Sequence, residues 1–379
     1  MATKTAKIEV QDGDILTGIR EFLKSVMQTD EIAAMLVPMR LPMKQVIMPV
    51  LVTDHKNIDN ADPLSPSFPI NAASLVSRLT RKPSGGKIAA ILRPCEIRAF
   101  IELVKLNQGK TDDLVMIGID CFGVYTNKDY RRLSEKDHAD VSKDHADISK
   151  DRADISIEKN STACKSCEHP IPYGADILIG ILGVDRQNNL LVQGLTDKGT
   201  SLINLVGLAE CEEPPDRKPA IRAFIESRKE YRDRMIEQTS RATDTLEKLT
   251  SYMADCVNCY NCRVACPVCY CKECVFVTDV FEHEPAQYLQ WSARKGAIKM
   301  PTDTIFYHLT RMAHMGTACV GCGQCSNACP NDIPVMELFK TIACRTQKAF
   351  EYEAGRSLDE QPPLSEFREN EFTEIVGIK

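Results

Sequence analysis

Short apolar runs rich in β-branched residues recur through the first half of the chain and predict buried strands. These runs are residues 46–52, 87–92, 114–119 and 177–184. Strands that are covered on both faces read as continuous apolar runs in a sequence. Apolar positions at helical spacing predict helices at 15–27 and 72–79 between them. Residues 1–212 are therefore predicted to form a mixed α/β domain.

The pattern changes after residues 211–216, a short segment rich in acidic residues and proline. Pro219 suits the first turn of a helix, and apolar positions at helical spacing follow it, so we predict a connecting helix within 213–250. Residues 251–346 are predicted to form an all-α domain. The predicted fold class is α+β, a mixed α/β domain followed by an all-α domain.

The second domain is predicted to contain an amphipathic helix and to end in a polar arm. Thr302 or Asp303 can cap that helix, whose apolar stripe would be Ile305, Phe306, Leu309, Met312 and Ala313. Residues 347–379 are predicted to be an arm on the protein surface or on a partner subunit, with a disordered tail as the alternative.

Residues 137–157 hold three copies of a seven-residue unit. A period of seven is typical of a coiled coil, but these apolar positions are two and five residues apart and form no continuous seam. His138 and His145 could be imagined as metal ligands, yet the third copy has Arg152 at that position. We interpret the repeat as a solvated surface loop or an exposed helix.

Composition and charge exclude several classes of function. A formal charge of −6 and a pI near 5.8 argue against nucleic-acid binding, which requires an excess of basic residues. No apolar run reaches the ~18 residues that a membrane-spanning helix needs, and the N-terminus has no apolar stretch that could serve as a signal peptide. Without an export signal, the 17 cysteines favour a reducing cytoplasm, where thiolates are metal ligands rather than disulfides.

Two cysteine runs with the same spacing occupy the second domain. They are Cys256-x2-Cys259-x2-Cys262-x3-Cys266-Pro267 and Cys319-x2-Cys322-x2-Cys325-x3-Cys329-Pro330. In such a run three thiolates cap one iron–sulfur cube, and the fourth cysteine typically ligates the other cluster. The spacing predicts two neighbouring 4Fe–4S clusters, which suit electron transfer in an anaerobe. Structural zinc is the alternative, although it prefers separated Cys pairs or mixtures of Cys and His.

The residues between the two runs, 267–318, are predicted to be helical, which favours an α-helical ferredoxin domain over the compact bacterial type. Three further cysteines follow the first run directly, namely Cys269, Cys271 and Cys274. The spacing shows no fourth ligand beside them. They are interpreted as ligands of a further cluster, as alternative ligands, or as unligated thiols on a docking surface.

Four cysteines of the first domain lie outside the two runs. Cys95 and Cys121 each follow a predicted strand, and Cys164 and Cys167 form a Cys-x2-Cys loop. Strand ends on one sheet edge can converge with such a loop, which would supply the four thiolates of a third 4Fe–4S cluster. The alternative is that Cys95 and Cys121 are buried as small hydrophobic residues.

No motif for nucleotide binding or nucleophilic catalysis stands out. Residues 179–183 lack the glycine spacing of a dinucleotide-binding turn, and residues 83–87 lack the first glycine of a P-loop. We interpret the remaining histidines near the cysteine runs as packing or surface residues, namely His283, His308 and His314. Any substrate reaction must therefore be electron or hydride chemistry on a cofactor.

Four short motifs follow one another through residues 10–185. They are Gln11-Asp12-Gly13-Asp14-Ile15-Leu16-Thr17-Gly18, Arg93-Pro94-Cys95-Glu96-Ile97-Arg98-Ala99, Ile117-Gly118-Ile119-Asp120-Cys121, and Cys164-Lys165-Ser166-Cys167 with Gly174-Ala175-Asp176-Ile177 after it. In this order they resemble the coenzyme F420 hydrogenase/dehydrogenase beta-subunit family. The second half resembles the α-helical ferredoxin domains of heterodisulfide reductase and succinate dehydrogenase iron–sulfur subunits. Such a fusion is similar to the beta subunits of formate dehydrogenases.

The resemblance implies an FAD beside one 4Fe–4S cluster, with the flavin exchanging a hydride with a deazaflavin, coenzyme F420. It implies that the ligands of this cluster are Cys95, Cys121, Cys164 and Cys167. Gly13 and Thr17 would then lie near the flavin. The implied architecture is a flavin/4Fe–4S domain followed by a two-cluster ferredoxin-type domain.

The leading hypothesis is a cytoplasmic electron-transfer subunit in a hetero-oligomeric complex. The flavin would split a hydride into single electrons, and the clusters would exchange them with a catalytic partner. That partner would be a formate dehydrogenase, a hydrogenase or a heterodisulfide-reductase-like complex. Asp14, Arg93 and the absence of lysine from 64–70 depart from the family pattern, and they favour the alternative of a flavin-free relay between two other redox subunits. A zinc-bound scaffold is the third hypothesis.

Overall fold

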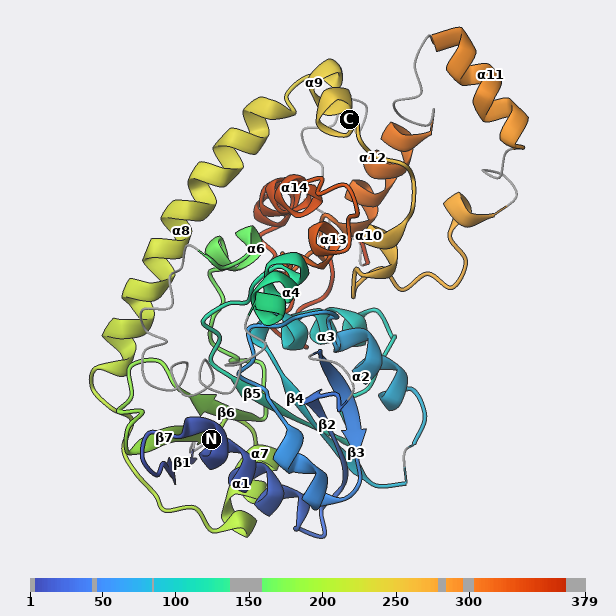
Figure 1. Cartoon of the computed structure of the whole chain (residues 1–379). Coiled ribbons are helices and arrows are strands. Elements are labelled where there is room, and N and C mark those ends of the chain that lie inside the picture. The colour runs from blue at the N-terminus through green and yellow to red at the C-terminus, as the bar shows by residue number, and fades with distance from the viewer. Residues whose placement is uncertain are drawn as a thin grey trace, which may run out of the picture.

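The computed structural model describes residues 4–42, 46–83, 85–136, 159–278, 284–295 and 303–365. The first half of the chain forms a sheet with helices on both faces, and the cysteine-rich second half forms a helical part beside it (Figure 1). The repeat at 137–157 and His283 lie outside the described residues.

A mixed sheet of seven strands forms the centre of the α/β part within the described residues. The strands are β1 (Lys4–Glu9), β2 (Ile32–Arg40), β3 (Ile47–Val52), β4 (Lys87–Leu92), β5 (Leu114–Ile119), β6 (Ile177–Gly180) and β7 (Asn189–Gly194). Their order is β1-β7-β6-β5-β4-β2-β3. The central strands β2, β4, β5 and β6 are parallel, while β3 at one edge and β7 and β1 at the other pair antiparallel. The carboxyl ends of the parallel strands therefore meet at one edge of the sheet.

The predicted strands at 46–52, 87–92 and 114–119 are confirmed as β3, β4 and β5. The run at 177–184 is a strand only as far as Gly180, because the next two amides donate to the carboxylate of Asp120 (2.9 and 3.0 Å). The apolar pattern does not predict β1, β2 and β7. In edge strand β1 charged residues interrupt the apolar positions, and a proline interrupts β2.

Helices cover both faces of the sheet. One face carries α1 (Ile15–Met27) and α7 (Asp197–Val206), and the other carries α2 (Ala73–Thr80) and α3 (Pro94–Lys105). A 3₁₀ helix, η1 (His55–Asn60), packs beside α1. The helix predicted at 15–27 is confirmed with the same bounds, and the helix predicted at 72–79 begins and ends one residue later.

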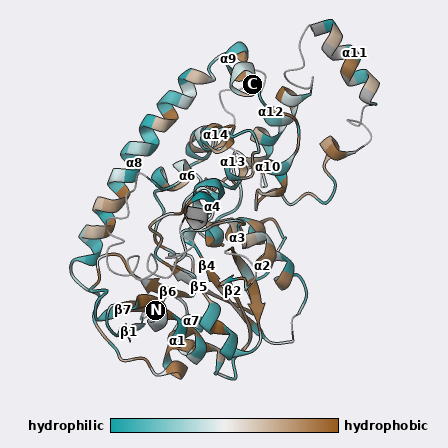
Figure 2. Cartoon of the chain, viewed as in Figure 1, coloured by the Kyte–Doolittle hydropathy of each residue, from teal (hydrophilic) through white to brown (hydrophobic). Residues whose placement is uncertain are grey.

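A long helix, α8 (Arg217–Ala242), runs along one side of the molecule from the sheet to α9 (Leu246–Tyr252) (Figure 1). It is largely hydrophilic (Figure 2). The other helices are α4 (Asn127–Lys136), α6 (Thr162–Lys165), α10 (Asn261–Val264), η3 (Val275–Val277), α11 (Pro285–Lys295), α12 (Thr304–Met315), α13 (Gln324–Asn327) and α14 (Val335–Ala349). None of the described helices combines the length and the apolar character needed to cross a membrane.

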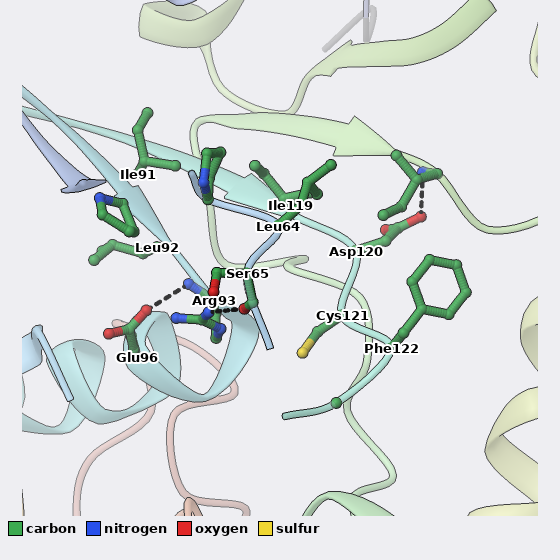
Figure 3. A pocket seen from close by; sticks show the side chains of 14 residues that line it. Leu64, Ser65, Ile91, Leu92, Arg93, Glu96, Ile119, Asp120, Cys121 and Phe122 are labelled. Carbon is green, nitrogen blue, oxygen red and sulfur yellow. Dashed lines mark hydrogen bonds between the residues drawn. The ribbon is translucent and has the colours of Figure 1, made fainter. Parts of the chain in front are cut away.

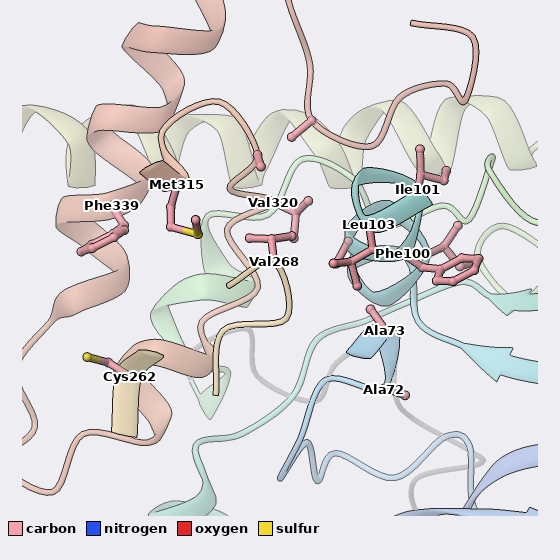
Figure 4. Packing of buried hydrophobic residues seen from close by; sticks show 14 of the residues in the cluster. Ala72, Ala73, Phe100, Ile101, Leu103, Cys262, Val268, Met315, Val320 and Phe339 are labelled. Atoms are coloured by element: carbon pink, nitrogen blue, oxygen red, sulfur yellow. The ribbon is translucent and has the colours of Figure 1, made fainter. Parts of the chain in front are cut away.

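One continuous core joins the sheet to the helical part. Phe100 and Leu103 of α3 belong to the same buried cluster as Val268, Met315 and Phe339 of the helical part (Figure 4). The two parts therefore share apolar contacts and are not merely tethered by α8.

The chain after α14 returns to the α/β part. Tyr352 is 5% exposed, and its hydroxyl donates to the carboxylate of Glu102 on α3 (2.6 Å). The described part of the predicted arm, up to residue 365, thus lies on the surface of this chain, and residues 366–379 fall outside the described residues.

Candidate metal centres

The first three cysteines of the first run meet the last cysteine of the second run. We call this group the outer site; it consists of Cys256, Cys259, Cys262 and Cys329, and all four line one pocket. Burial raises the pKa of Cys256 to about 11, and the thiolates of Cys262, Cys329 and Cys259 contribute. Cys329 therefore lies with the opposite run, as the spacing of the motif predicts.

The last cysteine of the first run lies with the first three cysteines of the second run. We call this second group the inner site. It consists of Cys266, Cys319, Cys322 and Cys325. Burial raises the pKa of Cys266 to about 11, with Cys319 adding to the shift. Burial also raises the pKa of Cys322 and Cys325, and in both the thiolate of Cys266 is the largest charge that adds to it. Each run thus gives its fourth cysteine to the other.

The two runs turn in the same way, because left-handed backbone falls at equivalent positions. In the first run these residues are Asn258 (φ 52°) and Tyr260 (φ 59°), and in the second they are Gly321 (φ 67°) and Gly323 (φ 81°). Glycine adopts this conformation freely, whereas a tyrosine there costs about 1–3 kcal/mol. Strain of this kind persists where the surrounding structure imposes it, which fits a turn shaped to hold a ligand.

The third group lies at the carboxyl edge of the sheet, and we call it the sheet-edge site. It consists of Cys95, Cys121, Cys164 and Cys167. Cys95 is in the first turn of α3 directly after β4, Cys121 follows β5, and Cys164 is in α6. Burial raises the pKa of Cys121 to about 11, with Cys164 as the next cause. The amide of Val124 donates to the sulfur of Cys164 (3.3 Å).

The three sites follow one another through the molecule. Burial raises the pKa of Cys95 in the sheet-edge site, and the largest charge that adds to it is Cys322 of the inner site. The inner site adjoins the outer site because Cys266 directly continues α10, which carries Cys262. Cys259 is exposed, so the outer site lies nearest the surface. The order is outer, inner, sheet-edge.

Two buried arginines and one partly buried arginine lie near these thiols. Arg228 is 2% exposed, and its charge opposes the upward shift in the pKa of Cys121. Arg311 is 4% exposed, and its charge does the same for Cys266. The thiolates of Cys95 and Cys167 favour the charged form of Arg98. The Nε atom of each is buried without a hydrogen-bond partner among the described residues. Cationic donors that lack acceptors suit a site where thiolates and inorganic sulfide carry negative charge. The residues present therefore fit iron–sulfur clusters.

Helix α12 carries three polar side chains onto the outer site, and here the prediction from sequence is wrong in part. The predicted stripe placed Phe306 and Leu309 on the buried face, yet they are 57% and 46% exposed. The buried face instead presents Tyr307, His308 and Arg311, because the thiols require hydrogen-bond donors. Their contacts are His308 Nε2 to Cys256 Sγ (3.4 Å), the Tyr307 hydroxyl to Cys262 Sγ (3.5 Å) and Arg311 Nη1 to Cys262 Sγ (3.1 Å).

The helix begins at Thr304, directly after Asp303, but the Asp303 side chain makes no capping hydrogen bond, and Thr302 lies outside the described residues. Met312 is buried as predicted, whereas Ala313 of the same stripe is exposed. His308, interpreted as a packing or surface residue, is a buried neighbour of a thiol. The signal that could have found it is the pair His308 and Arg311, which are three residues apart and share a helix face.

Three cysteines beyond the first run lie near the inner site. Burial raises the pKa of Cys269 to about 12, with Cys266 and Cys271 contributing, while Cys271 is exposed and Cys274 is half-buried. Across the described ranges, no three His, Cys, Asp or Glu side chains form a group that could hold a single metal ion. The further cluster at Cys269, Cys271 and Cys274 stays a prediction.

The pocket at the carboxyl edge of the sheet is largely filled by side chains of this chain. Arg93 donates to the carbonyl oxygens of Ser65 and Ser67 (2.8 and 3.0 Å) and stacks on the ring of Phe68 (4.9 Å), as Figure 3 shows for Arg93 and Ser65. The remaining cavity is about 30 Å³. That volume holds about two water molecules. A neighbouring cavity of about 220 Å³ is lined by Phe68, Val124 and Cys322 among others.

Asp120 and Arg217 close the neighbouring part of the same edge. Arg217 is 1% exposed and binds both carboxylate oxygens of Asp120 (2.6 and 3.2 Å). A Cβ atom on Gly180 would meet the Arg217 guanidinium at 2.9 Å, so the glycine makes room for this side chain. The start of α8 thus occupies space at the ends of β5 and β6.

Gly13 and Thr17, which the resemblance places near a flavin, are engaged elsewhere. Neither lines the pocket at the sheet edge. The side chain of Gln187 lies against Gly13 (φ 74°), and the carboxylate of Asp14 accepts from the amide and the hydroxyl of Thr17 (3.0 and 2.7 Å). The negative charge of the Asp14 carboxylate would repel a flavin phosphate placed at this helix start. The placement of Gly13 and Thr17 near a flavin stays a prediction.

Two interleaved cysteine runs beside a third group of thiols define a class of cysteine-rich proteins whose donors fit iron–sulfur clusters. Residues 85–215 match the family described as the C terminus of the coenzyme F420 hydrogenase/dehydrogenase beta subunit. The chain belongs to the coenzyme F420 hydrogenase/dehydrogenase beta-subunit family.

Two relatives extend the match beyond the sheet. The chain is 31% identical over 307 residues to F420-dependent formate dehydrogenase 1 subunit beta of Methanococcus maripaludis, covering 73% of this chain and 75% of that one. It is 27% identical over 344 residues to F420-dependent formate dehydrogenase subunit beta of Methanocaldococcus jannaschii, covering 84% and 85%. A chain of the F420-reducing NiFe hydrogenase complex from Methanosarcina barkeri aligns with a TM-score of 0.46 and 16% identity, covering 65% of this chain and 94% of that one.

Proposed function

We propose that this chain is an iron–sulfur electron-transfer subunit of an oxidoreductase complex. Three 4Fe–4S clusters would be held by the outer, inner and sheet-edge sites. The observation that supports the proposal is that Cys329 of the second run lines one pocket with Cys256, Cys259 and Cys262 of the first run. In the other direction, the charge of Cys266 acts on Cys322 and Cys325 of the second run. Bound clusters would supply one-electron transfer.

The residues around the three sites have separable roles in this proposal. The twelve cysteines hold the clusters, and the buried arginines offset their negative charge. Exposed Cys259 makes the outer site the point of electron exchange with a partner at the surface. Because the sites follow one another from Cys259 to the sheet edge, electrons would cross the shared core from one part of the chain to the other.

The partner is proposed from the relatives. Both are named beta subunits of F420-dependent formate dehydrogenases, so a catalytic formate dehydrogenase subunit is the partner they support. A hydrogenase or a heterodisulfide-reductase-like complex would use the same one-electron chemistry. The chain would thus act in the cytoplasm as one subunit of a hetero-oligomer.

The filled carboxyl edge supports a relay that works without a flavin. Arg93 and the Arg217–Asp120 pair occupy the edge where the resemblance implies a flavin beside the sheet-edge cluster. Without a two-electron carrier the chain would exchange only single electrons, and hydride chemistry would belong to another subunit. The second candidate is a flavin-bearing subunit that takes electrons from coenzyme F420, and the names of the relatives favour it.

Cofactor content tests this proposal directly. The full chain would be purified without oxygen and assayed for iron, acid-labile sulfide, zinc and released flavin. Three clusters correspond to about twelve iron atoms per chain. Full iron and sulfide without flavin would support the relay, stoichiometric FAD would support the second candidate, and zinc in place of iron would contradict both.

A further inference from the structure

Helix α14 packs against α6, the short helix of the sheet-edge site (Figure 1). Lys340 of α14 is 7% exposed, and its ammonium donates to the carbonyl oxygen and to the hydroxyl of Ser166 (3.3 Å to the hydroxyl). Ser166 is fully buried and stands between Cys164 and Cys167, two of the four cysteines of that site. Lys340 therefore ties this cysteine loop to the helical part.

The same side chain lies against a loop of the inner site. A Cβ atom on Gly321 (φ 67°) would be 3.2 Å from Cδ of Lys340, so the stem of the lysine packs on this turn. Gly321 stands between Cys319 and Cys322 of the inner site. One side chain is thus in contact with the cysteine loops of both sites.

A second contact brings the two loops together. Gly323 (φ 81°) follows Cys322, and a Cβ atom there would be only 2.5 Å from Cβ of Ala163, the residue before Cys164. Glycine is the residue that permits so close an approach of the backbone. No side chain fits between the loops at this point, so the inner and sheet-edge sites adjoin each other directly.

The buried charge of Lys340 lacks a carboxylate partner within the part of the chain that the structure describes. Its polar contacts there are the two with Ser166, whose oxygens are neutral. Burial of an ammonium costs several kcal/mol unless a negative charge compensates it. Clusters held by thiolates at the two adjoining sites would supply that negative charge.

We propose that Lys340 is a positioning residue at the junction of the inner and sheet-edge clusters, which holds the Ser166 loop and raises the reduction potential of the sheet-edge cluster. The inference rests on the proposed function, because it requires clusters at these sites. Lys340 would favour the step in which one electron leaves the inner cluster and reduces the sheet-edge cluster.

The physical reason is electrostatic. Reduction adds one negative charge to a cluster, and a cation fixed nearby lowers the free energy of the reduced form. The effect is larger in an interior of low dielectric than at the surface. The ammonium is anchored at Ser166, between two ligands of the sheet-edge site, whereas only the apolar stem lies against the inner loop. The sheet-edge cluster should therefore respond most, and the outer cluster least.

Redox titration of the anaerobically purified full chain, followed by electron paramagnetic resonance, measures the potential of each cluster. Lys340→Met removes the charge and the donor but keeps the length of the stem, and Lys340→Arg keeps the charge. Lys348→Met is the matched control, because Lys348 is an exposed lysine of the same helix. The signal that is missing from Cys121→Ala identifies the sheet-edge cluster. Iron and sulfide are measured in every variant.

In Lys340→Met we expect the sheet-edge cluster to become about tenfold harder to reduce, which is about 59 mV for one electron. The potential of the outer cluster should stay the same, and Lys340→Arg and Lys348→Met should match the wild type. Full clusters with an unchanged potential at the sheet edge would overturn the proposal. If Lys340→Met does not retain the sheet-edge cluster, Lys340→Arg decides: it must retain that cluster, and loss in this variant too would overturn the proposal.

Hydrogen exchange on the same samples gives a second readout, which is independent of the potentials. Because Lys340 holds Ser166, the amides of residues 161–168 should exchange faster in Lys340→Met than in the wild type and in Lys348→Met. Equal exchange rates would overturn the proposal. A wild-type chain without iron would instead contradict the proposed function, while the exchange rates would still report the contact between Lys340 and Ser166. The two failures are therefore distinguishable.

Discussion

Asp120 at the end of β5 and Arg217 at the start of α8 form a bidentate ion pair that is almost fully buried (2.6 and 3.2 Å). Asp120 also accepts from the amides of Ile181 and Leu182, and Arg217 donates to the carbonyl oxygen of Leu182 (2.7 Å). The pair thus joins two strand ends to the helix that leads to the cysteine-rich part. Every charged atom of the pair has a partner, as a buried charge requires.

Arg217→Met should destabilise the chain by about 3–5 kcal/mol, because it leaves the Asp120 carboxylate buried without its cation. Thermal unfolding followed by circular dichroism would measure the loss. Lys218→Met is the control, since the neighbouring Lys218 side chain is 76% exposed and should leave the unfolding temperature unchanged. Equal unfolding temperatures for both variants would contradict a structural role for the pair.

Cys329→Ala should empty the outer site although Cys329 belongs to the second run. Without its fourth ligand the cluster would be lost, and Cys256 and Cys259 would become open to alkylation. Cys319 and Cys322 should stay protected, because the inner site keeps all four of its cysteines. Alkylation without oxygen, followed by mass spectrometry of the peptides, would identify the modified residues.

Cys266→Ala is the reciprocal variant, and it should expose Cys319 and Cys322 while the outer site stays protected. Should each substitution instead expose the cysteines of its own run, the exchange of ligands between the runs would be wrong.

Cys121→Ala should lower the iron content of the chain by about one third, since one of three proposed clusters would lose a ligand. In the wild-type chain, burial and the Cys164 thiolate raise the pKa of Cys121 to about 11. Without a bound cluster, the Cys121 thiol is therefore protonated at neutral pH. The signals of the ferredoxin-type clusters should remain. Cys211→Ala, at a half-buried cysteine outside the three sites, is the control. Unchanged iron in Cys121→Ala would favour the alternative that this cysteine is simply packed.

Tyr352→Phe should destabilise the chain by about 1–3 kcal/mol, because the carboxylate of Glu102 loses a buried donor. Glu102 would keep the amide of Gly355 (2.7 Å) and the ammonium of Lys105 (3.1 Å). Chemical unfolding of the two proteins at neutral pH would measure the difference. Tyr173→Phe is a matched control, because Tyr173 is 70% exposed.

The same tyrosine predicts a pH dependence. Burial and then the Glu102 carboxylate raise the pKa of Tyr352, so the folded state favours the neutral phenol. The contribution of this tyrosine to stability is complete below about pH 10, the pKa of an unfolded tyrosine, and is lost as the pH rises above it. The stability advantage of the wild type over Tyr352→Phe should therefore shrink above about pH 10. An advantage that grows with alkaline pH would contradict this assignment.

The central strands and the motifs at the sheet edge could be predicted from the sequence because each is encoded by a few consecutive residues. Continuous apolar runs mark strands that are covered on both faces, which is why β3, β4 and β5 match their predictions. Edge strand β1 was not predicted because its exposed positions are polar. The helix at 15–27 could be predicted from the helical spacing of its apolar residues, and the Asp14 side chain caps it.

The buried face of α12 could not be predicted in the same way. An apolar stripe predicts burial only where the surroundings are apolar, and α12 packs on thiols. Tyr307, His308 and Arg311 are therefore buried, while Phe306 is exposed. The side chains that fill the carboxyl edge could not be predicted from the sequence either, because Arg217 contacts Asp120 across 97 residues of chain.

By itself, the sequence determined which cysteines stand at cluster spacing and, through the turn that each run requires, which of them cross between the runs. Only the tertiary structure decided that Arg311 of α12 contacts the sulfur of Cys262 and that Arg93 and Arg217 occupy the sheet edge. The reason is one of range. Ligand spacing is set within a few residues of chain, whereas a buried charge is placed by elements that meet only when the core has formed.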